Sequence, residues 1–305
     1  MNRRNFISKG ALAASFPLTA SMSFQKGKIQ KLDHNLDVRL LATKWGNRDT
    51  IDVFCARIKK EGYDGLEMWW SDDKDCVKQV IQSAIKHDLE IVWLTSAGAS
   101  NPKEYLREFR KNLEGASTSE KLPLCINTHS GRYFFSFEEN IKIIECSLEI
   151  EAKYGVEIFH ETHRGRMCFN APLTRKYLES NPKMKSTLDI SHWCCVHESM
   201  LDNQKENIDT VLRRTGHIHA RIGHPEGPQV NDPRAPEWES VVNQHFDWWD
   251  QAFRYRESSG AKRITILTEF GPPDYLPTLP YTRQPVADQW DVNLAMLEML
   301  KIRYR

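Results

Sequence analysis

The sequence predicts a single α/β domain folded as a closed (β/α)8 barrel. Short apolar or β-branched runs recur roughly every 30 residues, with a longer interval before the last, as expected for buried parallel strands. That spacing fits one strand, one helix and their loops, and eight such units match the length of a barrel domain. The predicted strands are residues 36–43, 64–70, 90–96, 122–130, 156–163, 186–193, 217–224 and 263–270.

Helical signals fill the intervals between these strands. Asn101 followed by Pro102 predicts a helix start, and Ser136 with Glu139 predicts a capping box. An open, doubly wound sheet is the alternative topology, but no G-x-G-x-x-G sequence follows the first predicted strand to support dinucleotide binding. Helix ends are expected at the glycines that follow the periodic segments, namely Gly62, Gly115, Gly155 and Gly260.

Residues 1–25 predict an export signal that is separate from the barrel domain, residues 30–305. The stretch "MNRRNFISKGALAASFPLTASM" combines a basic start with a short apolar run and small residues. The pair Arg3 and Arg4 is typical of the twin-arginine type, so we expect a bacterial protein exported to the periplasm. An ordinary basic and apolar N-terminus is the alternative. No later run of about 20 apolar residues exists, so no membrane span is expected.

Charge and cysteine content narrow the classes of partner. The chain has 42 basic and 41 acidic residues, a formal net charge of +1. This balance lacks the positive field that attracts phosphates, so no nucleic acid partner is expected. The seven cysteines form no C-x-x-C pair, which argues against a disulfide framework or a thiolate zinc site. We therefore expect a small-molecule ligand; a homo-oligomer is compatible with the sequence.

Ligand-type side chains lie near the ends of four successive predicted strands. These are Glu161, Asp189, His217 or His219, and Glu269. The active site of a (β/α)8 barrel gathers side chains from the carboxyl ends of its strands. Three carboxylates and one imidazole suit one divalent cation, Mn²⁺, Mg²⁺, Co²⁺ or Zn²⁺, with positions left for substrate. For each residue taken singly, a charge on the barrel rim is the alternative interpretation.

The ordered set of motifs resembles one enzyme family. The motifs are "FHETHRGR", "LDISHW", "GHIHARIG" and "LTEFGPP", within about residues 35–303. They are similar to the xylose isomerase-like TIM barrels, in the sugar isomerase and epimerase branch that includes tagatose 3-epimerase and inosose dehydratase. The resemblance implies one metal ion, with Mn²⁺ as the first choice, bound by Glu161, Asp189, His219 and Glu269. It also implies that Glu161 and Glu269 form the catalytic acid–base pair and that His192 contacts a substrate oxygen.

The function implied by this resemblance is isomerisation or epimerisation of a sugar or keto-sugar. A divalent cation would acidify the C–H beside a carbonyl, and the reaction would pass through an enediolate. The alternative is a lyase, dehydratase or hydratase that acts on a keto-sugar or keto-glycoside through the same intermediate. A non-catalytic sugar-binding barrel would not need both glutamates, and an endonuclease IV-like phosphodiesterase would need more histidine ligands. Export favours an unphosphorylated substrate.

Further polar side chains are expected to contact the substrate. Related epimerases carry an arginine six residues after the strand-seven histidine, where this chain has Pro225, so Arg221 and His224 are expected at the barrel mouth instead. Because residues 217, 219 and 221 alternate along a strand, they point the same way, with His219 as ligand and His217 in a deeper polar layer. Surface ion pairs are the alternative for His163 and Arg166, which follow strand five. For His129, at the end of strand four, the alternatives are a hydrogen-bonded loop histidine and a ligand of a second metal ion. These three further contacts are His163, Arg166 and His129.

Overall fold

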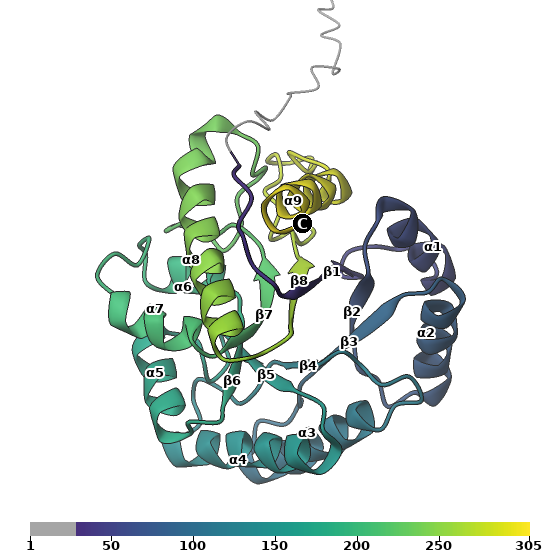
Figure 1. Cartoon of the computed structure of the whole chain (residues 1–305), viewed down its shortest axis with the longest axis vertical. Coiled ribbons are helices and arrows are strands. Elements are labelled where there is room, and N and C mark those ends of the chain that lie inside the picture. Colours follow the sequence, from purple (N-terminus) through teal and green to yellow (C-terminus); the bar gives the residue numbers. More distant parts are fainter. Residues whose placement is uncertain (1–28) are drawn as a thin grey trace, which may run out of the picture.

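The computed structural model describes residues 29–305, in which eight parallel strands close into a barrel (Figure 1). Each strand pairs with the next in chain order, and β8 pairs with β1 to close the ring, which confirms the predicted (β/α)8 barrel. The predicted export signal, residues 1–25, lies outside the described residues. The strands are β1 (Asp37–Thr43), β2 (Gly65–Trp69), β3 (Glu90–Thr95), β4 (Ile126–Thr128), β5 (Ile158–Glu161), β6 (Lys185–Leu188), β7 (Thr215–Ala220) and β8 (Arg263–Thr268).

Helices connect the strands and surround the barrel (Figure 1). In the part of the chain that the structure describes, no helix is long and apolar enough to cross a bilayer. The helices are α1 (Ile51–Glu61), α2 (Lys74–Lys86), α3 (Pro102–Ser117), α4 (Phe137–Tyr154), α5 (Ala171–Ser180), α6 (Ser191–Val196), α7 (Lys205–Leu212), α8 (Glu239–Ser258) and α9 (Gln289–Tyr304), with a 3-10 turn η2 (Pro236–Trp238) before α8.

The predicted helix signals are confirmed except at one glycine. The Asn101 side chain accepts hydrogen bonds from two backbone N–H groups of the first turn of α3, and the capping box at Ser136 begins α4. Gly155 ends α4 in the left-handed conformation, with φ of 74°. Gly115 was predicted to end a helix, and this is wrong because it lies inside α3. A Cβ at that position would lie 2.7 Å from Cζ2 of Trp70, so the close ring contact accounts for the glycine.

β6 and β7 end four or five residues earlier than predicted, the largest differences among the strands, and both ends affect the site. β6 stops at Leu188, after which the backbone N–H groups of residues 193 and 194 donate to Ile190 O at 3.0 and 3.1 Å instead of continuing the ladder. The resulting helix α6 carries His192, which was predicted to lie on a strand. β7 stops at Ala220, and His224 lies in a later turn that bridges to Gly227.

An apolar layer fills the barrel beneath the polar side chains. Phe159 on β5 occupies so much of the interior that a Cβ at Gly216 would lie 2.4 Å from its ring Cε1. Because alternate residues of a barrel strand face inward, the next inward position on β5 is Glu161. The fold therefore closes the barrel with hydrophobic side chains and places carboxylates above them. The layer consists of Leu41, Val92, Cys125, Phe159 and Leu267.

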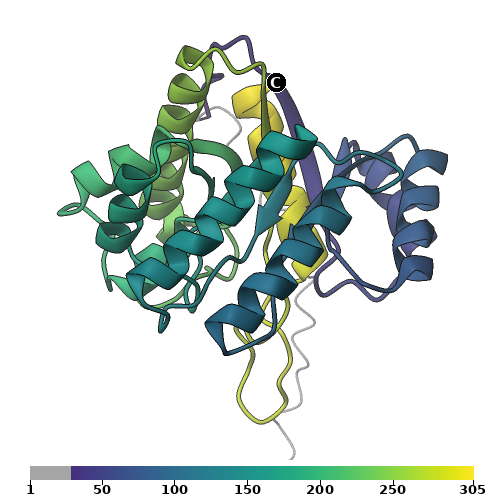
Figure 2. The same cartoon turned by 90° about the horizontal axis from the view of Figure 1, so that it is seen from below.

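Two segments outside the repeated units complete the domain. The segment before β1 runs between α8 and α9 (Figure 1), where Asn35 N donates to Glu257 Oε1 at 2.7 Å and Leu32 N donates to Arg303 O at 2.8 Å. The loop from β8 to α9 projects beyond the helices (Figure 2). This loop carries Tyr275, whose ring lines the main cavity.

Candidate active site

A cavity of about 300 Å³ lies at the carboxyl ends of the strands. Its aromatic walls are Trp45, Trp69 and Tyr275, and the rings of Trp45 and Tyr275 meet edge to face with centroids 4.9 Å apart. This volume and the mixture of apolar walls with a few polar groups are typical of small-molecule sites. The polar side chains in its lining include Glu67, His129, His163, Arg221 and Glu269.

His219 on β7 lies among the carboxylates that were predicted to bind metal. Its Nδ1 is 2.9 Å from Glu269 Oε2 and 3.7 Å from Glu161 Oε2. One ligand atom from each of Asp189, His219 and Glu269 falls within 4.8 Å of the others, and the same holds for Glu161, Asp189 and His192. All of these residues are buried. The structure thus brings the four predicted ligands together at the carboxyl ends of β5 to β8.

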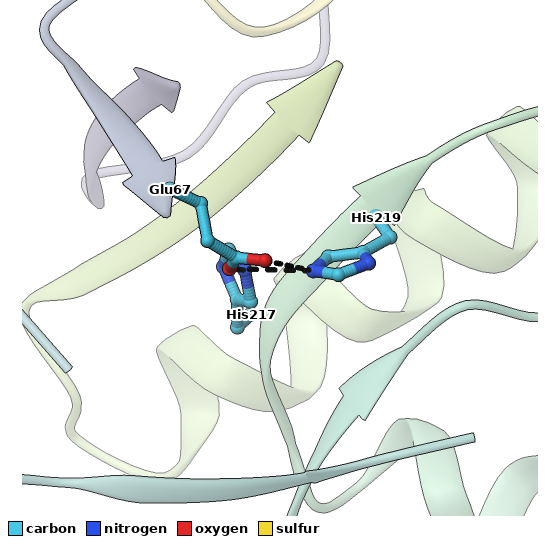
Figure 3. Close-up of side chains that lie close together, drawn as sticks. All are labelled: Glu67, His217 and His219. Atoms are coloured by element: carbon cyan, nitrogen blue, oxygen red, sulfur yellow. Dashed lines mark hydrogen bonds and ion pairs between the residues drawn. The ribbon is translucent and has the colours of Figure 1, made fainter. Parts of the chain in front are cut away.

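Glu67 on β2 binds both strand-seven histidines, and the sequence analysis missed it (Figure 3). Its Oε2 lies 2.8 Å from His217 Nε2, and its Oε1 lies 3.2 Å from His219 Nε2. His217 also has Nδ1 2.7 Å from Thr265 Oγ1, so it belongs to a deeper polar layer, as predicted. The signal for Glu67 was a single acid within the apolar run "DGLEMWW", where an inward carboxylate needs a buried partner.

Asn127 on β4 is a second polar residue that the sequence analysis missed. Its Nδ2 donates to Glu161 Oε2 at 2.7 Å and lies 3.0 Å from His219 Nε2. The amide thereby fixes the carboxylate of Glu161 relative to the imidazole of His219. An isolated Asn within the strand sequence "INTHS" gave no chemical pattern from which this role could be predicted.

Arg221 lies inside the site and not at the barrel mouth where it was predicted. Its guanidinium is almost completely buried and forms an ion pair with Asp189, and its Nη2 is 2.9 Å from His192 Nε2 and 3.6 Å from Glu269 Oε2. Its Nε donates to Ser191 Oγ at 3.2 Å. Because residue 221 follows residues 217 and 219 in the alternation, the strand direction carries the side chain inward. Arg221 therefore orients the Asp189 and His192 side chains.

His129 and His163 line one side of the cavity, and Arg166 contacts His129 from outside this lining. His129 Nε2 is 3.0 Å from Glu161 Oε2, and Arg166 Nη2 is 3.5 Å from His129 Nδ1. The His163 ring lies between two other imidazoles, with centroids 4.3 Å from His129 and 4.0 Å from His192. These residues lie in a continuous row of imidazoles beside Glu161.

His224 lies apart from this group. Its ring packs against Trp238 with centroids 4.9 Å apart, and its backbone pairs with Gly227. It is not among the residues that line the cavity. The early end of β7 explains the difference, because the chain leaves the barrel wall before position 224.

The buried charges shift one another's pKa values. Burial alone would raise the pKa of Glu67, but the charge of His219 and the hydrogen bonds from His217 and His219 hold it at about 2. Burial would lower the pKa of His219, yet the nearby Glu269, Glu67 and Glu161 carboxylates raise it well above its usual value. Burial raises the pKa of Asp189 to about 7, and repulsion from Glu269 and Glu161 acts in the same direction against the attraction of Arg221. Such perturbation is typical of functional sites.

The residues present fit a divalent cation. Glu161, Asp189 and Glu269 supply oxygen ligands and His219 supplies one nitrogen, a donor set that Mn²⁺, Mg²⁺ and Zn²⁺ accept. Within residues 29–305, Glu161 Oε1 is buried without a hydrogen-bond partner. A buried, unpaired carboxylate oxygen is costly unless a cation or proton satisfies it.

Comparison with solved structures places the chain among (β/α)8 barrels of the predicted kind. A 3-keto-D-glucoside 4-epimerase from E. coli matches with a TM-score of 0.55 and 13% identity, covering 87% of this chain and 99% of that chain. A probable 3-DHS dehydratase of petrobactin synthesis from Bacillus anthracis matches with a TM-score of 0.56 and 14% identity, covering 86% and 98%. A family 2 AP endonuclease from Brucella melitensis matches with a TM-score of 0.51 and 16% identity, covering 77% and 93%.

These likenesses confirm the resemblance to xylose isomerase-like TIM barrels at the level of the fold. No family model matches the sequence, and no curated protein matches it. The named activities of the three structures differ, so the chemistry of this chain has to be argued from its own residues.

Proposed function

We propose that the protein is a divalent-metal-dependent isomerase or epimerase of a sugar or keto-sugar. The observation that supports this most strongly is the convergence of Glu161, Asp189, His219 and Glu269 beside a cavity with aromatic walls. Ring faces of this kind pack well against the C–H surfaces of sugars, and the polar groups suit hydroxyl and carbonyl oxygens. The ligands are Glu161, Asp189, His219 and Glu269, and the ion is Mn²⁺ or another of the divalent cations named above.

The bound cation would polarise a substrate carbonyl and so acidify the adjacent C–H. Glu161 and Glu269 move the proton. They come from β5 and from the end of β8, and both lie beside the same His219 Nδ1. In the proposed reaction they act on opposite faces of the substrate carbon. One carboxylate removes the proton and the other returns one, to a neighbouring carbon in an isomerase or to the opposite face in an epimerase. His192 and Arg221 hold the substrate oxygen on which charge develops.

A dehydratase or lyase is the second candidate, because the same enediolate can expel a substituent from the next carbon. The presence of a dehydratase among the structures with this fold makes this alternative specific. The two candidate reactions differ in the mass of the product relative to that of the substrate. An isomerase or epimerase leaves the mass unchanged, and a dehydratase, hydratase or lyase changes it by water or by the released group.

The substrate is proposed to be unphosphorylated, and the enzyme to be exported by the signal in residues 1–25. Both statements rest on the paired arginines and apolar stretch at the start of the sequence. Faster turnover of a sugar phosphate than of its parent sugar would contradict the first. The second would be tested with a reporter protein fused to residues 1–25, whose export should depend on Arg3 and Arg4.

The experiment that tests the proposal is metal analysis of the purified protein, followed by deuterium exchange from solvent into a panel of sugars and keto-sugars. We expect exchange that disappears with chelation and returns with Mn²⁺. Glu161→Gln and Glu269→Gln should each lower the exchange rate by two to four orders of magnitude, as expected for a lost general acid or base. Glu145→Gln, on the exposed surface of α4, is the matched control and should exchange like the unaltered protein. Exchange that persists without metal would refute the proposal.

A further inference from the structure

A second hollow, of about 340 Å³, lies beside the main cavity. The two share Trp69, whose side chain is 48% exposed and whose ring meets that of His129 edge to face at 5.1 Å. Trp69 thus forms a partition between the two spaces and lines both of them. The second hollow is lined otherwise by Trp70, the residues after β3 and two arginines, Arg132 and Arg166.

Arg166 is the unusual member of this lining. Among residues 29–305 its Nη1 is buried without a hydrogen-bond partner, and its Nη2 has the 3.5 Å contact with His129 Nδ1. Within the same range no carboxylate lies within ion-pair distance of its guanidinium. Burial lowers the pKa of Arg166, and the charge of Arg132 lowers it further. A desolvated guanidinium without an acidic partner is unfavourable by itself.

Within ion-pair distance no carboxylate of the described chain compensates Arg166, and Glu161 acts on its charge only from farther away. Arg132 donates from Nη2 to the backbone oxygens of residues 97 and 98 at 3.0 and 3.1 Å, and so has positive charge left to face the hollow. Glu108, near this loop, accepts hydrogen bonds from the backbone N–H groups of residues 98 and 99 at 3.0 and 3.1 Å. No acidic residue of the described chain lines the hollow. The space is therefore positively charged.

The position of Arg166 connects this charge to the reaction. Arg166 contacts His129, and His129 Nε2 lies 3.0 Å from Glu161 Oε2, so one imidazole separates the guanidinium from the acid–base carboxylate. Because the two spaces share Trp69, a substrate in the main cavity would reach the second hollow past this ring. The planar fork of a guanidinium matches a carboxylate through two parallel hydrogen bonds.

We propose that the second hollow is a substrate subsite for a carboxylate group, so that the substrate of this protein is an acidic sugar such as a uronic acid or a glycoside that carries one. The inference rests on the proposed function for the part of the substrate that lies in the main cavity. Arg166 is the residue that recognises the carboxylate, and Arg132 adds to the positive potential. Trp69 packs against the sugar between the two sites.

Calorimetric titration of the Mn²⁺-loaded full chain tests this with matched pairs of sugars. The pairs are D-glucuronate with D-glucose, D-galacturonate with D-galactose, and the methyl glycosides of each. We expect the acidic member of at least one pair to bind roughly tenfold to a hundredfold more tightly, as expected for hydrogen bonds to a charged group. Arg166→Gln should remove that preference and leave the affinity for the neutral sugar unchanged. Arg166→Lys, which keeps the charge without the planar fork, should retain part of it.

Arg110→Gln is the matched control, because Arg110 lies on the outside of α3 and pairs with Glu149. It should bind both members of each pair like the unaltered chain. Thermal unfolding separates a binding role from a structural one: Arg166→Gln should keep or raise the melting temperature, since it removes a half-buried guanidinium that has no carboxylate within ion-pair distance.

Equal affinity for acidic and neutral sugars, no binding of any acidic sugar, or an equal loss for both in Arg166→Gln would overturn the inference. A preference for acidic sugars without deuterium exchange in any of them would support the subsite and contradict the proposed isomerase.

Discussion

Substituting Glu67 by glutamine should weaken metal binding although Glu67 is not one of the proposed ligands. Its carboxylate contacts His217 Nε2 at 2.8 Å and His219 Nε2 at 3.2 Å, whereas His219 Nδ1 faces Glu161 and Glu269. A carboxylate on the far nitrogen of a metal-binding histidine fixes the ring orientation and leaves the near nitrogen to bind the ion. Glu67 is therefore a positioning residue for His219.

The magnitude follows from the hydrogen bonds that change. The amide of Glu67→Gln has one acceptor oxygen and one NH₂ group, so either the Oε2 contact with His217 Nε2 or the Oε1 contact with His219 Nε2 loses its acceptor, and the negative charge is lost for both. Loss of one hydrogen bond to a charged acceptor costs about 1.5–3 kcal/mol. If that cost falls on the metal-bound form, affinity decreases about tenfold to a hundredfold, a range also typical of outer-shell substitutions.

Competition of the apo-protein with a chelator of known Mn²⁺ affinity measures this change directly. Glu145→Gln is the control for loss of a carboxylate elsewhere. Thermal unfolding of the apo-proteins then shows whether the effect lies in the fold. Unchanged Mn²⁺ affinity in a folded Glu67→Gln protein would refute the role of Glu67 in orienting His219.

Four further outcomes are expected. Saturating Mn²⁺ should stabilise the protein by about 2.7 kcal/mol at one hundred times its dissociation constant, measured as a rise in melting temperature, and a constant melting temperature would contradict the site. Burial lowers the pKa of His160 from 6.5 to about 3, so the free energy of unfolding should fall as the pH decreases through this range, by about 2 kcal/mol at pH 5. Denaturant titrations of His160→Gln should lack this part of the pH dependence. Gly216→Ala should cost about 1–3 kcal/mol of unfolding free energy because its Cβ meets Phe159; full stability would show that the ring can move. His224→Ala should keep deuterium exchange within about twofold, since His224 does not line the cavity, and a large loss would place it in the site.

The sign for His160 follows from which state binds the proton. His160 is buried between Ser130 Oγ and Ser147 Oγ, at 2.7 and 2.8 Å from its two ring nitrogens, and stays neutral in the folded state. The unfolded chain takes up a proton at its ordinary pKa of 6.5, which favours unfolding below that pH. The loss is complete near pH 3, where the folded state also becomes protonated. This dependence is separate from metal binding, because His160 points away from the barrel interior.

The barrel could be predicted because its signals are local and repeated. Strand runs, helix periodicity and caps such as Asn101 and Ser136 depend on neighbouring residues, so they are legible without knowledge of distant contacts. Gly115 shows the limit of this reasoning. A glycine near a helix end has the same local pattern whether it ends the helix or makes room for a ring. At Gly115 the reason is the ring of Trp70, which comes from the loop between β2 and α2, far away in the sequence.

The convergence of the proposed metal ligands could be predicted for a different reason. Strand ends of a parallel barrel meet at one face, so Glu161, Asp189, His219 and Glu269 were expected to converge before any contact was known. Glu67 could not be assigned in this way, because its role depends on the register that brings β2 opposite β7 across the barrel. The direction of Arg221 was predicted only in part: the alternation of side chains that begins at residues 217 and 219 carries it into the site and not to the barrel mouth.

The charge balance of the site connects these observations. Four carboxylates are buried at the site. Arg221 pairs with Asp189 and lies 3.6 Å from Glu269, Glu67 faces the strand-seven imidazoles, and Glu161 faces His129 and His219. Burying a carboxylate without a positive partner is unfavourable, and Arg221 is committed to Asp189. A divalent cation beside Glu161 and Glu269 would balance the remaining charge and would release His219 from its role as their proton donor. The same set of contacts thus supports the proposed metal ion and accounts for the position of Arg221 within the site.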